Sequence, residues 1–448
     1  MMVRRLLFHQ FGLIYRISFW FSRHFSPLGH FLLGLAMVSA AFGANTRAAA
    51  TYQLSALLVA VFCISLLWSY FGRRAKLPLS VERQLPRYAT VGEPLPYQIT
   101  LSNHGTRVER GLSMLDQLSL NFPTWAEFSA TADAAQERRN PFDRYVGFHR
   151  WQGLMRTKRG SSLEERPLPD LPPGQRVNVT LELNPLRRGR LQFSDLCIYR
   201  PDPFGLFRTR HLLPLPKVCH VLPRHYPISP LPMVGGRSYQ RGGVALANAI
   251  GESHEFLALR DFRLGDVPRN IHWRSSAKLG RWVVKEFQDE YFVRQALVLD
   301  TFCEASSAAA FEAAVSVAAS LVIKEPQRDS LLDLLFIEQD IQCFTAGRGL
   351  AGSMELLEVL AGLQLASLGT FDHLAQSLMQ RTQALSEVVL VLLDWDPPRQ
   401  NLVQSLRLTG LPLAVLLVRE QLPDPPPEPG CFFRLVRPKQ LAADLQWN

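Results

Sequence analysis

The six cysteines of this 448-residue chain are scattered, without a Cys-x-x-Cys pair and without a Cys/His cluster. This spacing excludes a disulfide framework and a zinc site built on ligand pairs, and it favours a reducing compartment for most of the chain. The C-terminal third has no G-x-G-x-x-G after its first apolar strand, and the chain has no G-x-x-x-x-G-K-[ST]. Nucleotide binding through the usual phosphate loops therefore has no support.

Acidic residues are missing from residues 1–81, which hold eight Lys and Arg residues. The formal net charge of +10 divides into +8 over this segment, +9 over residues 82–290 and −7 over residues 291–448. The basic excess is therefore a membrane-topology signal together with one basic middle region. This distribution argues against nucleic acid as a partner.

Two apolar runs, residues 28–44 and 51–71, predict a transmembrane helical hairpin within an N-terminal segment of residues 1–77. The second run is long enough to cross a hydrocarbon core of roughly 30 Å, and the first is at the short end. Basic residues flank the pair and only Arg47 lies between the runs, so the positive-inside rule predicts two passes with both termini in the cytoplasm. A cleaved signal peptide is the alternative, but the second run would still insert.

The middle of the chain, residues 78–225, predicts a β-sandwich-like module. Short alternating segments such as "GQRVNVTLEL" are bounded by Pro and Gly, which is typical of sandwich strands. Residues 121–165 break this pattern, and their composition indicates a long charged insertion or flexible loop.

The last segment, residues 291–448, predicts an α/β domain with a mostly parallel sheet. Buried-strand patterns at residues 295–301, 386–396 and 411–420 alternate with helical patterns. Ligands of such sheets bind beyond the carboxyl ends of the strands. Asp300 ends the first of these strands, Asp394 and Asp396 end the second, and all three are therefore singled out.

Residues 226–290 contain the most distinctive stretch, "HEFLALRDFRLGDVPRNIHWRSSAKLGRWVVKEFQDE" at 254–290. With "LRRGRLQFSDLCIYRPDPFGLF" at 186–207, it resembles the signature of a bacterial family known as domain of unknown function fifty-eight. The resemblance covers the whole order of hairpin, β module, signature and α/β domain. Its signature residues include Glu255, Arg260, Gly265, Asp266, Arg269, Trp273, Ser276 and Lys285.

The resemblance implies a membrane-anchored bacterial protein whose last domain is similar to von Willebrand factor A. It also implies partnership with a MoxR-type AAA+ ATPase and sometimes with a transglutaminase-like membrane protein. Domains of that kind often bind a divalent cation through D-x-S-x-S, but here the pattern is Asp300-Thr301-Phe302-Cys303-Glu304. We expect no cofactor. The alternative is a metal-dependent ligand-binding domain that uses Asp300, Glu304 and Asp394.

From the residues themselves, Asp266 is expected to cap a helix that begins near Val267 and stops at Gly280. In that helix Arg269, Trp273 and Ser276 would share one face. The following strand, residues 281–290, is expected to pair with residues 295–300.

In the signature stretch, His272 could act as a base beside Ser275 or Ser276, but no known catalytic motif surrounds these residues. The signature residues are therefore interpreted as a structural ion-pair network or a docking surface. The resulting hypothesis is a non-enzymatic adapter in the bacterial inner membrane. Its acidic α/β domain would offer a surface to a partner.

Overall fold

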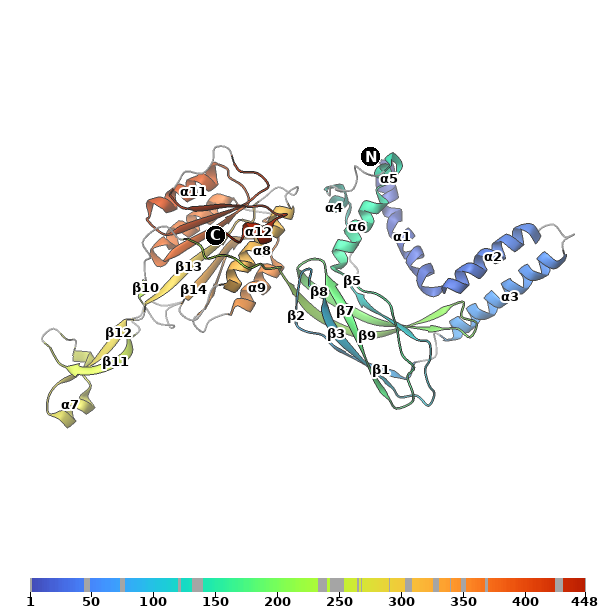
Figure 1. Cartoon of the computed structure of the whole chain (residues 1–448), viewed down its shortest axis with the longest axis horizontal. Coiled ribbons are helices and arrows are strands. Elements are labelled where there is room, and N and C mark those ends of the chain that lie inside the picture. The colour runs from blue at the N-terminus through green and yellow to red at the C-terminus, as the bar shows by residue number, and fades with distance from the viewer. Residues whose placement is uncertain are drawn as a thin grey trace. The chain divides into compact units, whose positions relative to one another are not determined.

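The chain forms two compact units, Met1–Leu222 and Pro223–Asn448 (Figure 1). The computed structural model describes residues 2–43, 49–72, 77–119, 122–130, 140–232, 240–241, 254–263, 266, 268–289, 291–302, 308–324, 330–338, 340–347, 352–366, 370–423 and 430–447.

The first unit begins with three helices, α1 (Met2–His24), α2 (Pro27–Gly43) and α3 (Ala49–Gly72). Helices α2 and α3 pack against each other (Figure 1). Residues 53–72 of α3 are long and apolar enough to cross a membrane, whereas the apolar part of α2, residues 27–41, is shorter. One helix therefore meets the requirement for a membrane span, and the two-pass topology remains a prediction.

Two β-sheets of the first unit share one apolar core, to which Ile99, Leu101, Leu183 and Ile198 contribute fully buried side chains. Strand β7 alternates exposed and buried residues, as a strand with one solvated face should. The four-stranded sheet has the order β1 (Leu79–Gln84), β3 (Leu95–Asn103), β7 (Arg176–Pro185), β5 (Ser161–Ser162). The five-stranded sheet has the order β2 (Tyr88–Thr90), β9 (Arg208–Leu222), β8 (Gly189–Pro201), β4 (Ser113–Leu118), β6 (Arg166–Pro167).

The segment at 121–165 is not a flexible loop over its described residues, so that prediction was wrong. It contains the helices α4 (Trp125–Ala130), α5 (Pro141–Val146) and α6 (Phe148–Arg159). Phe128 and Trp151 bury their rings against Phe8 and Phe11 of α1. The charged composition concealed these helices because their partner helix lies more than 100 residues away in the sequence.

In the second unit, one sheet has the strand order β15-β14-β13-β16-β17-β18, in which β15 is antiparallel to β14 and the remaining neighbours are parallel. The short β10 (Gln240–Arg241) also pairs with β13. The mostly parallel sheet is therefore confirmed. Its strands are β13 (Tyr291–Leu299), β14 (Ser330–Ile337), β15 (Ile341–Ala346), β16 (Glu387–Leu392), β17 (Leu413–Val418) and β18 (Phe432–Val436).

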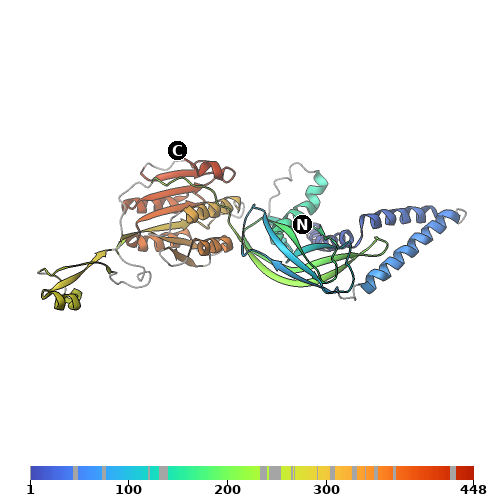
Figure 2. The ribbon, with the colours of Figure 1, turned by 60° about the horizontal axis from the view of Figure 1, so that its bottom comes forward.

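Helices cover both faces of this sheet (Figure 2). Side chains of α10 and α11 join one core cluster with Val298 and Leu390, and α8 contacts β13, β16 and β17. The long helices are α8 (Ala308–Lys324), α9 (Ser353–Gly362), α10 (Phe371–Arg381) and α11 (Pro397–Leu408), and the short α12 (Leu441–Asp444) follows β18. Helix α11 was not predicted from the sequence, because its first turn follows directly on the acidic end of a buried strand.

The signature stretch forms a separate small element, which we call the arm (residues 254–289). It consists of the strands β11 (His254–Asp261) and β12 (Val283–Asp289), a 3₁₀ turn (Pro268–Asn270) and the helix α7 (Trp273–Leu279). Strand β12 pairs antiparallel with β11 and not with residues 295–300. That expectation was wrong because a single residue separates β12 from β13, which is too short for a hairpin turn.

Candidate functional site

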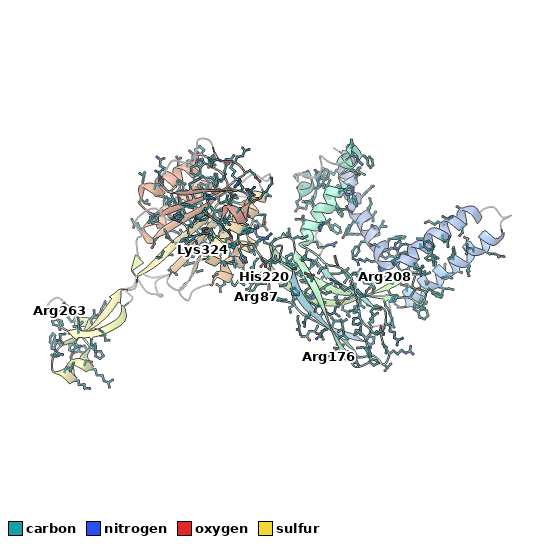
Figure 3. All side chains as sticks on the ribbon, in the orientation of Figure 1. Arg87, Arg176, Arg208, His220, Arg263 and Lys324 are labelled. Atoms are coloured by element: carbon teal, nitrogen blue, oxygen red, sulfur yellow. The ribbon has the colours of Figure 1, made fainter. Side chains whose placement is uncertain are left out.

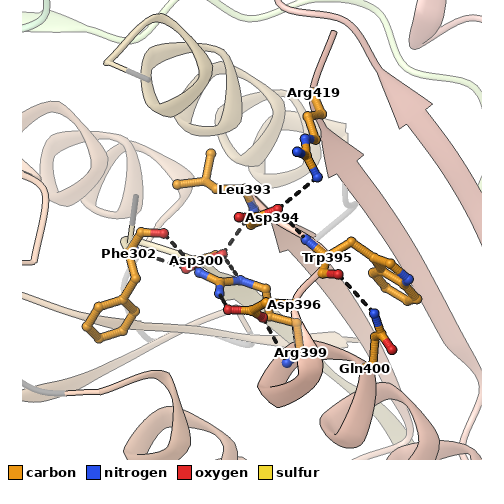
Figure 4. A network of polar contacts seen from close by, with 9 residues as sticks. All are labelled: Asp300, Phe302, Leu393, Asp394, Trp395, Asp396, Arg399, Gln400 and Arg419. Atoms are coloured by element: carbon orange, nitrogen blue, oxygen red, sulfur yellow. Dashed lines mark hydrogen bonds and ion pairs between the residues drawn. The ribbon is translucent and has the colours of Figure 1, made fainter. Parts of the chain in front are cut away.

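The carboxyl ends of β13 and β16 form the switch point of the sheet. From β13 the chain continues to β14 on one side, and from β16 it continues to β17 on the other side. Asp300 lies directly after β13, and its side chain is completely buried. Its Oδ1 accepts a hydrogen bond from the Phe302 backbone N–H at 3.0 Å (Figure 4). Its Oδ2 accepts from the Leu393 N–H at 3.0 Å and from Arg399 Nε at 2.7 Å. Asp300 therefore joins the ends of two strands to α11.

Arg399 completes this network from the first turn of α11. Its Nη1 donates to Asp396 at 2.5 Å and its Nη2 donates to the Phe302 carbonyl at 2.9 Å. Asp396 also caps α11 by accepting from the Arg399 N–H at 3.2 Å. Burial raises the pKa of Asp300, and the neighbouring guanidinium opposes that rise. Burial would lower the pKa of Arg399, but its bonds to Asp300 raise it overall.

The donor set at this switch point does not fit a divalent cation. Both oxygens of Asp300 already accept N–H groups, and one of these groups belongs to a cation. Thr301 is buried and donates to the Ile337 carbonyl at 2.5 Å, while Asp394 is exposed and paired with Arg419 at 2.8 Å. Glu304 lies outside the described residues. Within the described ranges, no three His, Cys, Asp or Glu side chains gather in a way that could hold a metal.

The arm contains a second aspartate–arginine network. Arg260 Nη2 and Nη1 donate to the two carboxylate oxygens of Asp266 at 2.7 and 2.8 Å, and the Arg263 N–H donates to Asp266 at 2.8 Å (Figure 3 labels Arg263). The Arg260 side chain and the Arg263 N–H lower the pKa of Asp266 to about 2. Asp266 therefore organises the turn after β11.

The expected helix start near Val267 was wrong. Because the Asp266 carboxylate serves this turn, the chain makes the 3₁₀ turn first and α7 begins only at Trp273. The expected stop was correct, since Gly280 ends α7 in the left-handed region at φ 63°. Gly265 and Val267 lie outside the described residues.

Arg269, Trp273 and Ser276 do not share a helix face, so that expectation was also wrong. Arg269 belongs to the 3₁₀ turn, Trp273 is 65% exposed, and Ser276 is buried. Ser276 Oγ accepts from the Val283 N–H at 3.0 Å and donates to the His272 carbonyl at 3.1 Å. Ser276, together with the His272 N–H that donates to the Val283 carbonyl at 2.8 Å, therefore fastens α7 to β12.

Two further predicted residues lie on the strands of the arm. Lys285 is half-buried on β12, opposite Leu259. Glu255 lies on β11, opposite Gln288, and its side chain is outside the described part of the chain. His272 Nδ1 lies 2.7 Å from Ser275 Oγ, and in the described structure no side chain orients this ring from its Nε2 side.

Large apolar side chains are exposed on the arm. Trp273, Leu279 and Trp282 are 65%, 55% and 58% exposed, and the Trp282 ring meets Phe262 edge-on. Residues 268–285 carry five basic side chains and no acidic one. Trp and Arg are the residue types that dominate binding energy at protein interfaces. The arrangement can therefore bind a partner that offers apolar pockets inside an acidic rim.

Two functional residues were missed from the sequence. Arg399 could have been found from "DWDPPR", because Asp followed by Pro at the first helical positions is a helix-start signal. Trp282 stands in an alternating strand pattern, and nothing in that pattern distinguishes it from a core residue.

Comparison with known proteins gives limited similarity. No protein-family model matches the chain. A 148-residue segment is 28% identical to the uncharacterized protein YeaD of Bacillus subtilis, and it spans 33% of this chain and 35% of that protein.

Two solved structures are weakly similar to parts of the chain. A CARDB domain of the PF1109 protein from Pyrococcus furiosus, solved with di-metal ions, covers 30% of this chain and 85% of its own at 10% identity and a TM-score of 0.16. The manganese-loaded TRAP protein of Plasmodium vivax covers 35% of this chain and 72% of its own at 9% identity and a TM-score of 0.27. At this level of similarity, the function has to be argued from the residues of the chain itself.

Proposed function

We propose that this protein is a non-enzymatic, membrane-anchored adapter that docks an acidic partner protein on the arm. The observation that carries this proposal is the exposure of Trp273, Leu279 and Trp282 beside five basic side chains. Exposed apolar groups on so small an element are typical of interaction sites. The interpretation of the signature residues as a docking surface supports the same conclusion.

The switch point supports an adapter more than a metal-dependent receptor. The resemblance to domain of unknown function fifty-eight implies that residues 291–448 form a von Willebrand factor A-like domain, whose first metal ligand would be Asp300. Arg399 neutralises that carboxylate internally. The domain would therefore serve as a rigid platform for the arm, without a cation at this position.

The anchor in this proposal is α3, with α2 as a second, shorter pass, in the inner membrane of a bacterium. The partner is a MoxR-type AAA+ ATPase, as the resemblance implies, and a transglutaminase-like membrane protein is a further associate. Both termini and the two folded units would face the cytoplasm, where such an ATPase works.

The test is co-purification after cross-linking in gently solubilised membranes that hold the full-length protein. We expect an AAA+ ATPase to be recovered with the unaltered chain and lost with Trp273→Ala/Trp282→Ala. Removing two aromatic anchors should cost about 2 kcal/mol or more, roughly thirtyfold in affinity.

Leu408→Ala is the matched control, because Leu408 is 85% exposed on α11, outside the arm. Equal recovery with the double variant and this control would contradict docking on the arm. Circular dichroism of both variants shows whether the fold is retained.

A further inference from the structure

The first unit has a hollow of about 170 Å³ where the C-terminal end of α6 meets the first residues of β8. The end of β4 and Val221 of β9 complete its wall. We call it the basic cleft. A water molecule takes about 30 Å³ of liquid, so the cleft is several water molecules in size and has room for a phosphate group.

The charge lining this cleft is of one sign. Five cationic side chains line it: Lys158, Arg159, Arg187, Arg188 and Arg190. Among the described lining residues there is no aspartate or glutamate. Lys158 is paired with Glu127 at 2.7 Å outside the lining, and the Arg159 guanidinium donates to the neutral Tyr15 hydroxyl of α1. Lys158, Arg159 and Arg188 therefore each have a contact of their own, and the inference of a bound anion rests chiefly on Arg187 and Arg190.

The backbone brings the two groups of cations together. Gly160 ends α6 in the left-handed region at φ 78°, and its carbonyl accepts a hydrogen bond from the Leu186 N–H at 2.7 Å. A Cβ at Gly160 would lie 3.0 Å from Leu191 Cδ1 of β8, so the backbone of α6 ends close to β8 at this residue. This close approach sets Lys158 and Arg159 beside Arg187 and Arg188 of the β7–β8 turn and Arg190 of β8.

Helix capping explains only part of this arrangement. Cations at the end of α6 are stabilised by the partial negative charge of the helix C-terminus, which accounts for Lys158 and Arg159. Arg187, Arg188 and Arg190 come from another element and gain nothing from that dipole. Mutually repelling cations around a hollow are stabilised most directly by a bound anion, and arginine presents a fork of donors that matches phosphate oxygens.

We propose that the basic cleft binds a phosphate-bearing anion through these five side chains. Anion binding in the cleft does not depend on partner docking on the arm, because the cleft and the arm belong to different units. The phosphate group could belong to a phospholipid headgroup or to a free phosphate compound.

A lipid source is favoured by the surroundings of the cleft. An adjoining hollow shares Leu118 and Arg159 with the cleft and is lined in addition by Phe19 and Leu163, together with Arg23 and with Asp116, which is paired with Arg83 inside the fold. A partly apolar hollow beside a basic cleft matches the two ends of an amphiphile.

The test uses the full-length chain with two probes. Binding of inorganic pyrophosphate to the protein in neutral detergent is measured by calorimetry. The thermal unfolding midpoint is measured after reconstitution into phosphatidylcholine nanodiscs with and without phosphatidylglycerol. We expect pyrophosphate binding, or a midpoint raised by phosphatidylglycerol, in at least one of these two measurements. Arg187→Glu/Arg190→Glu should weaken the binding about tenfold or more.

The matched control is Arg107→Glu/Arg176→Glu, which makes the same charge change at exposed positions of the same unit away from the cleft lining (Figure 3 labels Arg176). Arg187→Lys/Arg190→Lys, which keeps the charge, should retain part of the binding. A response to phosphatidylglycerol that the cleft variant loses assigns a headgroup, and a response to pyrophosphate alone assigns a free anion. No response to either probe, or an equal loss in the control, overturns the proposal.

Discussion

The Asp300–Arg399 and Asp266–Arg260 pairs join the same two side-chain types at the same 2.7 Å, in opposite environments. The first pair has 0% and 6% of its side chains exposed, and the second has 15% and 30%. In the first, both carboxylate oxygens and all three guanidinium nitrogens are hydrogen-bonded within the fold, whereas the second holds a turn in an arm that exposes two tryptophans. The residue types of an ion pair therefore do not show whether it is purely structural or supports a binding surface.

The free-energy consequences differ for a physical reason. Removing one partner of a buried pair leaves an uncompensated charge in a medium of low dielectric constant. Removing one partner of an exposed pair leaves a charge that water can solvate.

Arg399→Ala should have the largest effect. It leaves Asp300 buried without its cation, and we expect the free energy of unfolding of the second unit to fall by about 3–5 kcal/mol. Denaturant unfolding of the full-length chain measures this change. Arg419→Ala is the control, since it removes the partner of the exposed Asp394 and should change stability by about 1 kcal/mol or less. Equal losses in the two variants would remove the distinction drawn above.

Ser276→Ala should destabilise the arm by about 1–3 kcal/mol, because the buried Val283 N–H loses its acceptor. Hydrogen exchange at Val283 should become faster, while exchange in β13 stays unchanged. Ser275→Ala, which breaks only the contact with the half-buried His272 ring, is the comparison. Unchanged protection at Val283 would contradict the fastening role of Ser276.

Arg260→Gln should return the pKa of Asp266 from about 2 towards its ordinary value of 3.8. A lowered pKa in the folded state means that Asp266 stabilises the arm fully above about pH 4, and that this contribution is lost as the pH falls towards 2. Carboxyl NMR titration measures the pKa directly. The same value in both proteins would mean that Arg260 does not hold this carboxylate.

Adding Mn²⁺ or Mg²⁺ should produce the smallest effect, with no change in the unfolding midpoint and no heat of binding. The oxygens of Asp300 are occupied by N–H donors, so a cation would have to displace Arg399. A raised midpoint that Asp300→Asn abolishes would favour the metal-dependent alternative.

The predictable parts of the fold were those with strong local patterns. The strands of the second unit follow from continuous apolar runs, and the stop of α7 follows from Gly280. The helices at 125–159 were not predictable, since Trp151 is buried only through contact with α1. The pairing of β12 with β11 likewise depends on a partner strand that local periodicity does not specify.

For the candidate site, residue types near Asp300 and Asp266 were identifiable, but their roles were not. Asp300 was singled out by its place after a buried strand, and its side chain accepts the N–H of Phe302 in the loop that follows. Its pairing with Arg399 joins residues 99 positions apart, and the pattern around either residue contains no trace of the other.

The amino-acid sequence by itself determined the order of apolar helices, alternating strands and buried strands, because hydrophobic periodicity is a local property. It also determined that the basic and acidic residues lie in separate segments. Only the tertiary structure decided which charges are buried, which aromatic rings are covered, and that α6 and β8 bring five cations around one cleft. Burial and proximity depend on contacts between distant segments, and those contacts exist only once the chain has folded.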